Sequence, residues 1–195
     1  MNFLASKLDG GMIALIVVAI VVLLLIMIIG WYISTRNKFI RYEQDIESSE
    51  SRIDVYLTKR YDLLTKMVAT TKGYAKHEAE TLENIIGMRN PGSKASVKEK
   101  QDFNNMMTEV ESKINVVVEN YPTLKADSLF LGLQQSITEV EENLQAARSN
   151  YNSNVSTFNK AILQFPASIV AGSRFTKKDY FEAEDIKKND VKIEF

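Results

Sequence analysis

MIALIVVAIVVLLLIMIIGWYI, residues Met12 to Ile33, is the stretch that decides how this chain is built. It contains no charged residue and no proline, and its single glycine, Gly30, lies near its end. As a helix it would be roughly 33 Å long, enough to cross a hydrocarbon layer about 30 Å thick. Because a backbone in lipid must satisfy its own hydrogen bonds, we predict a transmembrane helix despite the many valines and isoleucines. Trp31 and Tyr32 at its end suit the headgroup level.

Two other interpretations of this stretch fit less well. A buried core helix would need apolar surroundings, and no other stretch of the chain is apolar enough to provide them. A cleaved signal peptide has an apolar region of about 7–15 residues followed by a small-x-small site, which this sequence lacks. The chain contains no cysteine, which excludes a lipid-modified cysteine anchor, disulfides and Cys-ligated metals.

The flanks of the apolar stretch predict its orientation. Residues 1–11 carry one basic side chain, Lys7, whereas Arg36, Lys38 and Arg41 follow shortly after the stretch. Basic residues near a span favour the cytoplasmic side. We therefore expect the N-terminus outside and the rest of the chain in the cytoplasm.

The remainder of the chain is rich in charge but balanced, with 24 basic and 25 acidic residues in total. It has no basic face of the kind that nucleic acid requires, so no nucleic-acid partner is expected. The three prolines, Pro91, Pro122 and Pro166, divide it into long uninterrupted stretches, which suggests helices.

From Arg36 to about Met88, apolar residues recur mostly at steps of three, four or seven, which predicts an amphipathic helix. No polar loop precedes Arg36, so the transmembrane helix is expected to run directly into this one. Gly73 weakens the helix by about 1 kcal/mol relative to alanine. A turn at residues 90–93 (NPGS) then ends it. The apolar positions are Ile46, Ile53, Leu57, Leu64, Met67, Tyr74, Leu82, Ile85 and Ile86.

Two more helices are predicted. One runs from about Ser96 to Tyr121 and is closed by Pro122, and the other starts near Asp127, a plausible N-cap. Its steps of three and four continue to Phe165, as in a long bundle or coiled-coil seam. The apolar positions are Phe103, Met106, Met107, Val110, Ile114, Val117 and Tyr121, and then Phe130, Leu133, Ile137, Val140, Leu144, Ala147, Tyr151, Val155, Phe158, Ile162 and Phe165.

These helices would be roughly 39 and 58 Å long. Short connections make neighbouring helices antiparallel, so an up-down-up order is expected, with the third helix overshooting by about 20 Å. Exposing Phe158, Ile162 and Phe165 there would be unfavourable, so the segment after Pro166 is expected to fold back over that end.

The C-terminal part is predicted to hold short elements. Residues 166–172 and 180–188 are each expected to form a short helical turn. Val191, Ile193 and Phe195 alternate with charged residues, which suits a strand or an extended tail. Such a tail needs a docking surface, either on its own third helix or on a neighbouring copy.

Taken together, these residues resemble the LemA family, bacterial membrane proteins with one N-terminal span and a helical-bundle domain. The resemblance covers nearly all of the chain beyond the span. It is carried by Ser51–Leu64 (SRIDVYLTKRYDLL), Gly73–Glu78 (GYAKHE), Tyr121–Ala126 (YPTLKA), Leu133-Gln134, Glu142, Ala147-Arg148, Tyr151-Asn152, Phe158-Asn159, Phe165-Pro166, Tyr180–Glu184 (YFEAE) and Val191–Phe195 (VKIEF).

The resemblance implies a bacterial inner-membrane protein with no known enzymatic activity. Members of the family are often encoded beside a membrane metalloprotease of the HtpX type, and relatives occur in magnetosome membranes. These associations suggest a membrane-protein partner without defining a mechanism.

His77, the only histidine, is the one candidate centre for an enzyme. A zinc helix of the H-E-x-x-H type would need a second histidine at position 81, which is Thr81. A di-iron bundle uses Glu-x-x-His pairs, and the residue three before His77 is Tyr74. A structural, hydrogen-bonding role for His77 on a helix face fits better. The sequence also lacks a G-x-S-x-G elbow and a glycine-rich phosphate loop.

Two further groups of side chains are candidates. Glu141-Glu142, together with Glu182, Glu184 and Asp185, could form an acidic patch, although exposed carboxylates on helices are usually only solvated. The Tyr-Asn and Phe-Asn pairs at 151–152 and 158–159 are seven residues apart. The rings are expected in the core and the amides in solvent; alternatively, the two amides bond to a neighbouring helix and fix its register.

The prediction is thus an all-α protein, a single N-terminal transmembrane helix followed by a long antiparallel bundle of three to four helices. We expect a non-enzymatic scaffold or adaptor that contacts the lipid bilayer, self-associates and holds no metal or cofactor. A hydrolase or metalloenzyme centred on His77 is the alternative. The parts are a short segment at 1–11, the transmembrane helix at 12–33, the helical bundle at 34–189 and an extended tail at 190–195.

Overall fold

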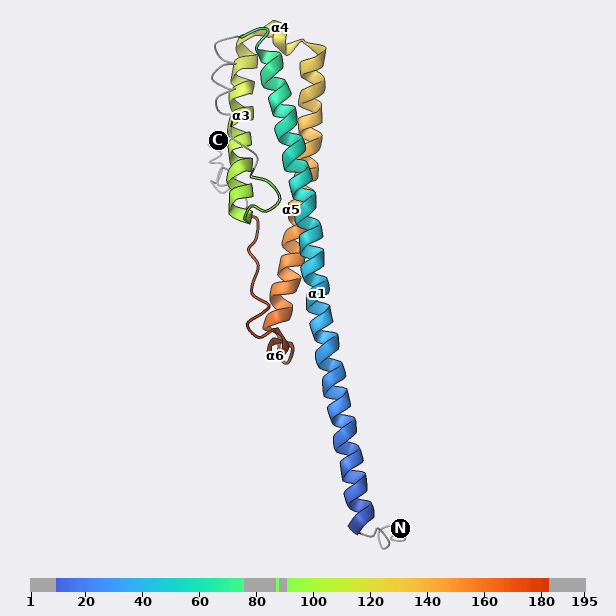
Figure 1. Cartoon of the computed structure of the whole chain (residues 1–195). Helices are drawn as coiled ribbons and strands as arrows, with labels where there is room; N and C mark the ends of the chain where they lie inside the picture. The colour runs from blue at the N-terminus through green and yellow to red at the C-terminus, as the bar shows by residue number, and fades with distance from the viewer. Residues whose placement is uncertain (1–9, 76–86, 88–90, 183–195) are drawn as a thin grey trace, which may run out of the picture. The chain divides into compact units, whose positions relative to one another are not determined.

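The structure, a computed structural model, describes residues 10–75, 87 and 91–182. Every regular element in these residues is a helix, which confirms the predicted all-α class (Figure 1). The elements are α1 (Gly10–Thr71), α3 (Val97–Asn120), α4 (Pro122–Lys125), α5 (Ser128–Leu163) and α6 (Ala167–Ala171).

The chain folds as two compact units that are each built from separate stretches of sequence. The anchor unit contains residues up to 43 together with 158–177, and the bundle unit contains 44–157 together with the residues from 178 onward. Helices α1 and α5 each contribute to both units.

Helix α1 is continuous from the apolar stretch into the amphipathic one, as predicted. Its residues from Met12 to Ile33 are all exposed, and the helix is long and apolar enough to cross a membrane. The expected end near Met88 is wrong, because the helix ends at Thr71. The N–H groups of Gly73 and Tyr74 bond back to backbone oxygens of residues 70 and 71 in a turn that follows it. Glycine favours such an end because it stabilises helix poorly.

The core of the bundle unit consists largely of the apolar positions predicted from periodicity. The buried members are Ile46, Ile53, Leu57, Leu64 and Met67 on α1, Phe103, Met107, Val110, Ile114 and Val117 on α3, and Phe130, Leu133, Ile137, Val140, Leu144, Ala147, Tyr151 and Val155 on α5. Tyr74 is an exception, since it is 40% exposed and its hydroxyl donates to Asp127 Oδ2 at 2.8 Å. Leu82, Ile85 and Ile86 lie outside the described residues.

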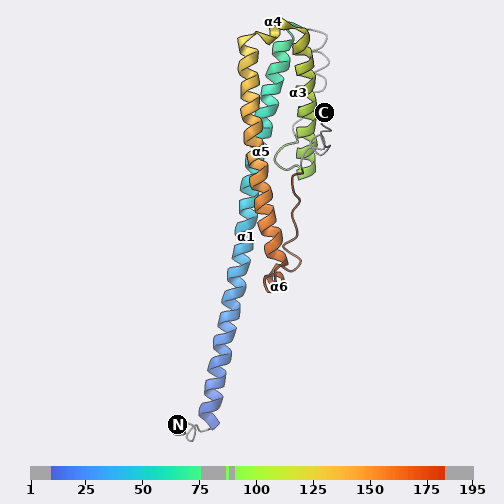
Figure 2. The same cartoon turned by 180° about the vertical axis from the view of Figure 1, so that it is seen from behind.

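The helix directions differ from the expected up-down-up order. Lys100 bonds to Glu50 on α1, and the later residue Glu111 bonds to the later residue Arg60, so α3 runs parallel to α1. Helix α5 runs antiparallel to both, as Figures 1 and 2 show. We assumed that only a short turn connects the first two helices. This assumption is wrong, because α1 already ends at Thr71. The longer stretch that leads to α3 permits a parallel neighbour.

Side-chain caps define the helix starts. Ser96 and Glu99 form a capping box at α3, in which each accepts a hydrogen bond from the other's backbone N–H. Asp127 Oδ1 accepts from the Phe130 N–H at 2.9 Å at the start of α5, as its predicted N-cap role requires. Pro122 follows α3 as expected, but it also begins the short helix α4, which the sequence analysis missed.

In the anchor unit, the chain after α5 folds back over the end of that helix, as predicted. The ring of Phe175 packs against Phe39 of α1 at 5.1 Å and against Phe158 of α5 at 6.4 Å between centroids. Phe158 and Ile162 are buried, but Phe165, which we expected to be covered, is 83% exposed. Helix α6 lies within the predicted helical turn at 166–172.

The helical turn expected at 180–188 is wrong in its described part. Residues 178–182 are not helical. The tail at 190–195, for which docking on its own chain or on another copy was left open, lies outside the described residues.

Candidate functional site

A buried arginine joins the three long helices of the bundle unit. Arg60 of α1 is 2% exposed, and its Nη1 donates to Asn104 Oδ1 of α3 at 2.7 Å. Its Nη2 lies 2.8 Å from Glu111 Oε2 on α3 and also binds Glu141 Oε1 on α5. The Thr108 hydroxyl lies 3.3 Å from both Nη atoms. We call these five residues the Arg60 cluster.

The Arg60 cluster combines one guanidinium with two carboxylates that are partly screened from water. Glu111 and Glu141 are 23% and 40% exposed, against 2% for the arginine. A guanidinium presents its donors in a fixed planar fork, so its partners must approach from defined directions. The cluster therefore restricts how α3 and α5 are placed against α1. Among the described residues, Arg60 Nε has no acceptor.

A second buried cation joins α1 and α3. Lys100 is 1% exposed, and its Nζ lies 2.7 Å from Glu50 Oε1 and 2.8 Å from Asp54 Oδ1. Burial raises the pKa of Asp54, and the hydrogen bond and charge of Lys100 oppose that rise. Neither buried cation was predicted from the sequence. The sequence did contain a signal for this burial, because each cation lies on the apolar face of its helix. Arg60, for example, lies on the same face as Leu57 and Leu64.

Beside the Arg60 cluster lies a groove of about 540 Å³, which we call the bundle groove. It is formed by α1, α3 and α5 together with the non-helical residues that follow position 178. Its lining side chains are Arg60, Asn104, Thr108, Thr138, Glu141, Glu142, Leu144, Gln145, Arg148, Asn152, Phe181 and Glu182.

Residues 178–182, which we call the docked segment, form part of the wall of the bundle groove through Phe181 and Glu182. Asn152 binds the backbone of this segment on both sides of one residue: its Oδ1 accepts from the Phe181 N–H at 2.9 Å, and its Nδ2 donates to the Phe181 carbonyl at 2.8 Å. The Gln101 side chain of α3 accepts from the Glu182 N–H at 3.3 Å. These three hydrogen bonds all bind backbone groups of the docked segment.

An aromatic contact completes this docking. The Phe181 ring is 4% exposed and packs edge-on against Tyr151 at 5.2 Å between centroids. The Tyr151 hydroxyl donates to the Asp179 carbonyl at 3.1 Å. Burial, and secondarily the charges of Glu50 and Asp179, raises the pKa of Tyr151 to about 12. The hydroxyl therefore keeps its proton, and its donor role, throughout the neutral range.

Replacing Asn152 by alanine should release the docked segment. The change removes two hydrogen bonds of about 0.5–1.5 kcal/mol each, so the segment should open more often and trypsin should cleave faster after Lys178. The measurement is the cleavage rate of the full chain in detergent micelles. Asn150→Ala, an exposed neighbour on the same helix, is the control and should cleave like the native chain. Equal rates for both variants would contradict this account of the docking.

The structure places the candidate residues from the sequence as follows. Glu141 and Glu142 both line the bundle groove, where Glu141 binds Arg60, and Glu182 lines the same groove. These three carboxylates thus share one groove, which Arg60 and Arg148 also line. Glu184, Asp185 and His77 lie outside those residues. Within the described ranges no group of three or more His, Cys, Asp or Glu side chains could hold a metal ion.

Neither of the two predictions for the Tyr151-Asn152 and Phe158-Asn159 pairs is completely correct. Tyr151 and Phe158 are in the core, as expected. The amides are not simply solvated, because Asn159 is 7% exposed and Asn152 is hydrogen-bonded. The partner of Asn152 is the docked segment and not a neighbouring helix, which the period-seven spacing alone could not reveal.

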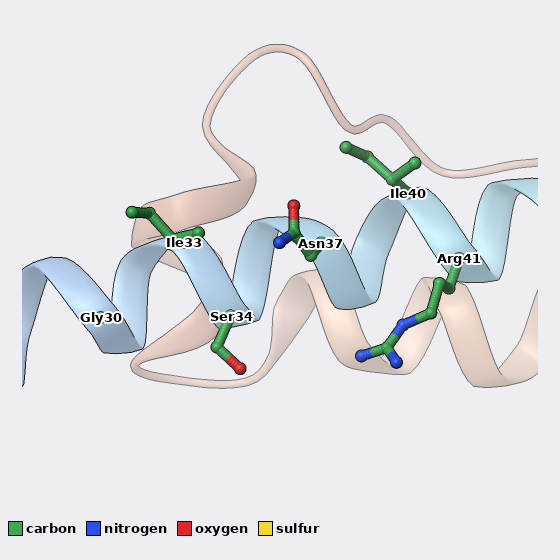
Figure 3. A pocket seen from close by; sticks show the side chains of 6 residues that line it. All are labelled: Gly30, Ile33, Ser34, Asn37, Ile40 and Arg41. Atoms are coloured by element: carbon green, nitrogen blue, oxygen red, sulfur yellow. The ribbon is translucent and has the colours of Figure 1, made fainter.

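A second hollow, of about 630 Å³, lies on α1 in the anchor unit, just after the apolar stretch (Figure 3). All six of its lining residues come from this one helix: Gly30, Ile33, Ser34, Asn37, Ile40 and Arg41. Because no second element contributes to it, it is a surface depression beside the helix rather than an enclosed site.

Comparison with known proteins identifies the family. The sequence model of the LemA family matches residues 49–195, which is most of the chain and includes every residue described for the bundle groove. The chain belongs to the LemA family. The resemblance found in the sequence motifs is thereby confirmed.

Individual proteins are also similar to this chain in sequence. The chain is 28% identical over 163 residues to Protein LemA of Metamycoplasma hominis, covering 82% of this chain and 74% of that protein. It is 21% identical over 174 residues to magnetosome proteins MamQ 1 and MamQ 2 of Paramagnetospirillum magneticum, covering 75% of this chain. The match spans 64% of the length of each of these two magnetosome proteins.

Proposed function

We propose that this LemA protein is a single-pass, membrane-anchored adaptor without enzymatic activity, which holds extended polypeptide segments in its bundle groove. The single observation that carries the proposal is the docked segment, whose backbone is bound on both sides of Phe181 by Asn152. Such a site binds the backbone of a segment through hydrogen bonds and selects an aromatic side chain at one position, as in other modes of extended-peptide recognition. The bundle groove is therefore suited to segments from more than one chain.

We expect the bundle groove of one copy to bind the docked segment of another copy, so that the protein self-associates. The docked segment of one copy and the bundle groove of another have the same chemistry as the contact within one chain, so the two can exchange. Confinement by a membrane anchor raises the local concentration of copies and favours such exchange. We therefore propose a homo-oligomer in the membrane.

A photoreactive amino acid in place of Tyr180, which is 45% exposed, tests this proposal in native membranes. The expected product is an adduct of two copies or of one copy with another membrane protein. Val116, which is 59% exposed on α3, is the control position and should give little adduct. Adding Asn152→Ala should weaken the product from Tyr180. Adducts within single chains alone would contradict the adaptor function.

The partner in such an adduct would be identified by mass. A membrane metalloprotease of the HtpX type is one candidate, and it rests on the family association alone. If a change that prevents contact with the partner also abolishes the function of this chain, the non-enzymatic role is supported, because such a function requires binding and no catalysis.

The anchor is proposed to lie in a bacterial inner membrane with the bundle in the cytoplasm. Arg36, Lys38 and Arg41 favour this orientation over Lys7 alone. A reporter active only outside the cytoplasm should be silent when fused after Phe195. The same reporter fused before Met1 is the matched control and should be active, and a strong signal from the C-terminal fusion would contradict the orientation.

A further inference from the structure

The anchor unit carries a strong excess of positive charge close to the apolar stretch. Residues 34–43 and 158–177 contain a single acidic residue, Glu43. The whole chain, by contrast, has 24 basic and 25 acidic residues, so this excess is local. The basic residues in the two segments are Arg36, Lys38, Arg41, Lys160, Arg174 and Lys177.

The same unit exposes large apolar side chains outside the apolar stretch. Leu163 at the end of α5 is 60% exposed, Phe165 is 83% exposed, and Ile169 of α6 is 67% exposed. Their neighbours Ile162 and Val170 are buried. Residues 163–169 therefore lie between two buried apolar side chains and expose three large apolar side chains of their own. We call them the apolar loop.

The apolar loop lies at the level where the apolar stretch ends. Phe175 contacts both Phe39 and Phe158, which brings these two rings into the same part of the anchor unit. From Phe158, α5 continues for five residues to Leu163, or about 7.5 Å, toward the apolar part of α1. An equal distance along α1 from Phe39 leads back to Ser34.

We propose that the apolar loop is a second membrane contact, which inserts Phe165 and Ile169 into the interfacial layer of the same leaflet that surrounds the end of the apolar stretch. The surrounding basic residues select a leaflet rich in anionic lipid. This arrangement follows the general pattern of interfacial segments, in which apolar side chains enter the acyl boundary and lysine or arginine meets the headgroups. The inference rests on the proposed membrane anchor, and it adds a second point of attachment.

The test uses tryptophan emission, because the chain contains one tryptophan, Trp31. The full chain is placed in vesicles of phosphatidylcholine and phosphatidylglycerol whose acyl chains carry bromine near the headgroup end. The native protein reports on the apolar stretch. Phe165→Trp in a Trp31→Phe background reports on the apolar loop. Val116→Trp in the same background is the control, since this exposed position lies in the bundle unit.

The expected result is quenching of the Phe165→Trp variant to an extent similar to that of the native protein, with Val116→Trp unquenched. Quenching of Phe165→Trp should fall when phosphatidylglycerol is omitted. If the native protein is quenched but Phe165→Trp is not, the apolar loop does not enter the membrane and the inference is overturned while the anchor stands. A blue shift of that variant without quenching would assign the loop to a protein contact and would overturn the inference too. Failure of quenching in the native protein would overturn the anchor itself.

Discussion

Replacing Arg60 by alanine is expected to lower the free energy of unfolding by about 3–5 kcal/mol, the cost of removing one partner from a buried ion pair. The change removes the cation that Glu111 and Glu141 share and the hydrogen bond that Arg60 donates to Asn104. Urea denaturation of the full chain in detergent micelles, followed by circular dichroism, measures the loss.

The neighbouring residue supplies a matched control for this experiment. Lys59 is exposed, so Lys59→Ala should change the stability by less than about 0.5 kcal/mol. Because Arg60 and Glu141 share one cluster, the double change Arg60→Ala with Glu141→Ala should cost less than the sum of the single changes. A loss for Arg60→Ala as small as that for Lys59→Ala would show that the buried cluster does not hold the helices together.

Phe158→Ala should have a comparable effect, a loss of about 3–5 kcal/mol, since it removes a fully buried ring from the anchor unit. Phe158 has no exposed surface and packs against Phe175. Thermal melts of the full chain in detergent measure the change.

Phe165→Ala is the control for this second prediction. The two phenylalanines are seven residues apart on one sequence pattern, but Phe165 is 83% exposed. Its replacement should cost less than about 0.5 kcal/mol in detergent, where it has little packing to lose. Equal losses for the two variants would contradict the packing described for the end of α5.

Local patterns predicted those features that depend on single helices. The uncharged run from Met12 to Ile33 requires a helix if it lies in lipid, and its direct continuation into the next helix followed from the lack of any breaker. The buried positions on α3 and α5 followed from steps of three and four, because these steps place residues on one side of a helix. Ser96 and Asp127 mark helix starts by their own hydrogen-bonding chemistry.

The spacing of apolar residues gave wrong predictions of burial where tertiary packing, and not the local sequence, decides whether a side chain is buried. Phe165 continues the spacing of Phe158, but the helix ends at Leu163, so the next aromatic no longer lies on the buried face. Tyr74 similarly follows the end of α1 and bonds to Asp127 instead of entering the core.

Sequence patterns alone predicted the membrane-length helix, the all-α class, the apolar faces of the long helices and, through ordered motifs, membership of the LemA family. Three features became visible only in the folded chain: α3 runs parallel to α1, Arg60 and Lys100 are buried among carboxylates, and Asn152 binds the backbone at Phe181. The physical reason is range. Helix formation and amphipathic spacing act between residues a few positions apart, whereas each of these features joins side chains or backbone groups about 30 or more positions apart, whose meeting depends on how whole helices pack.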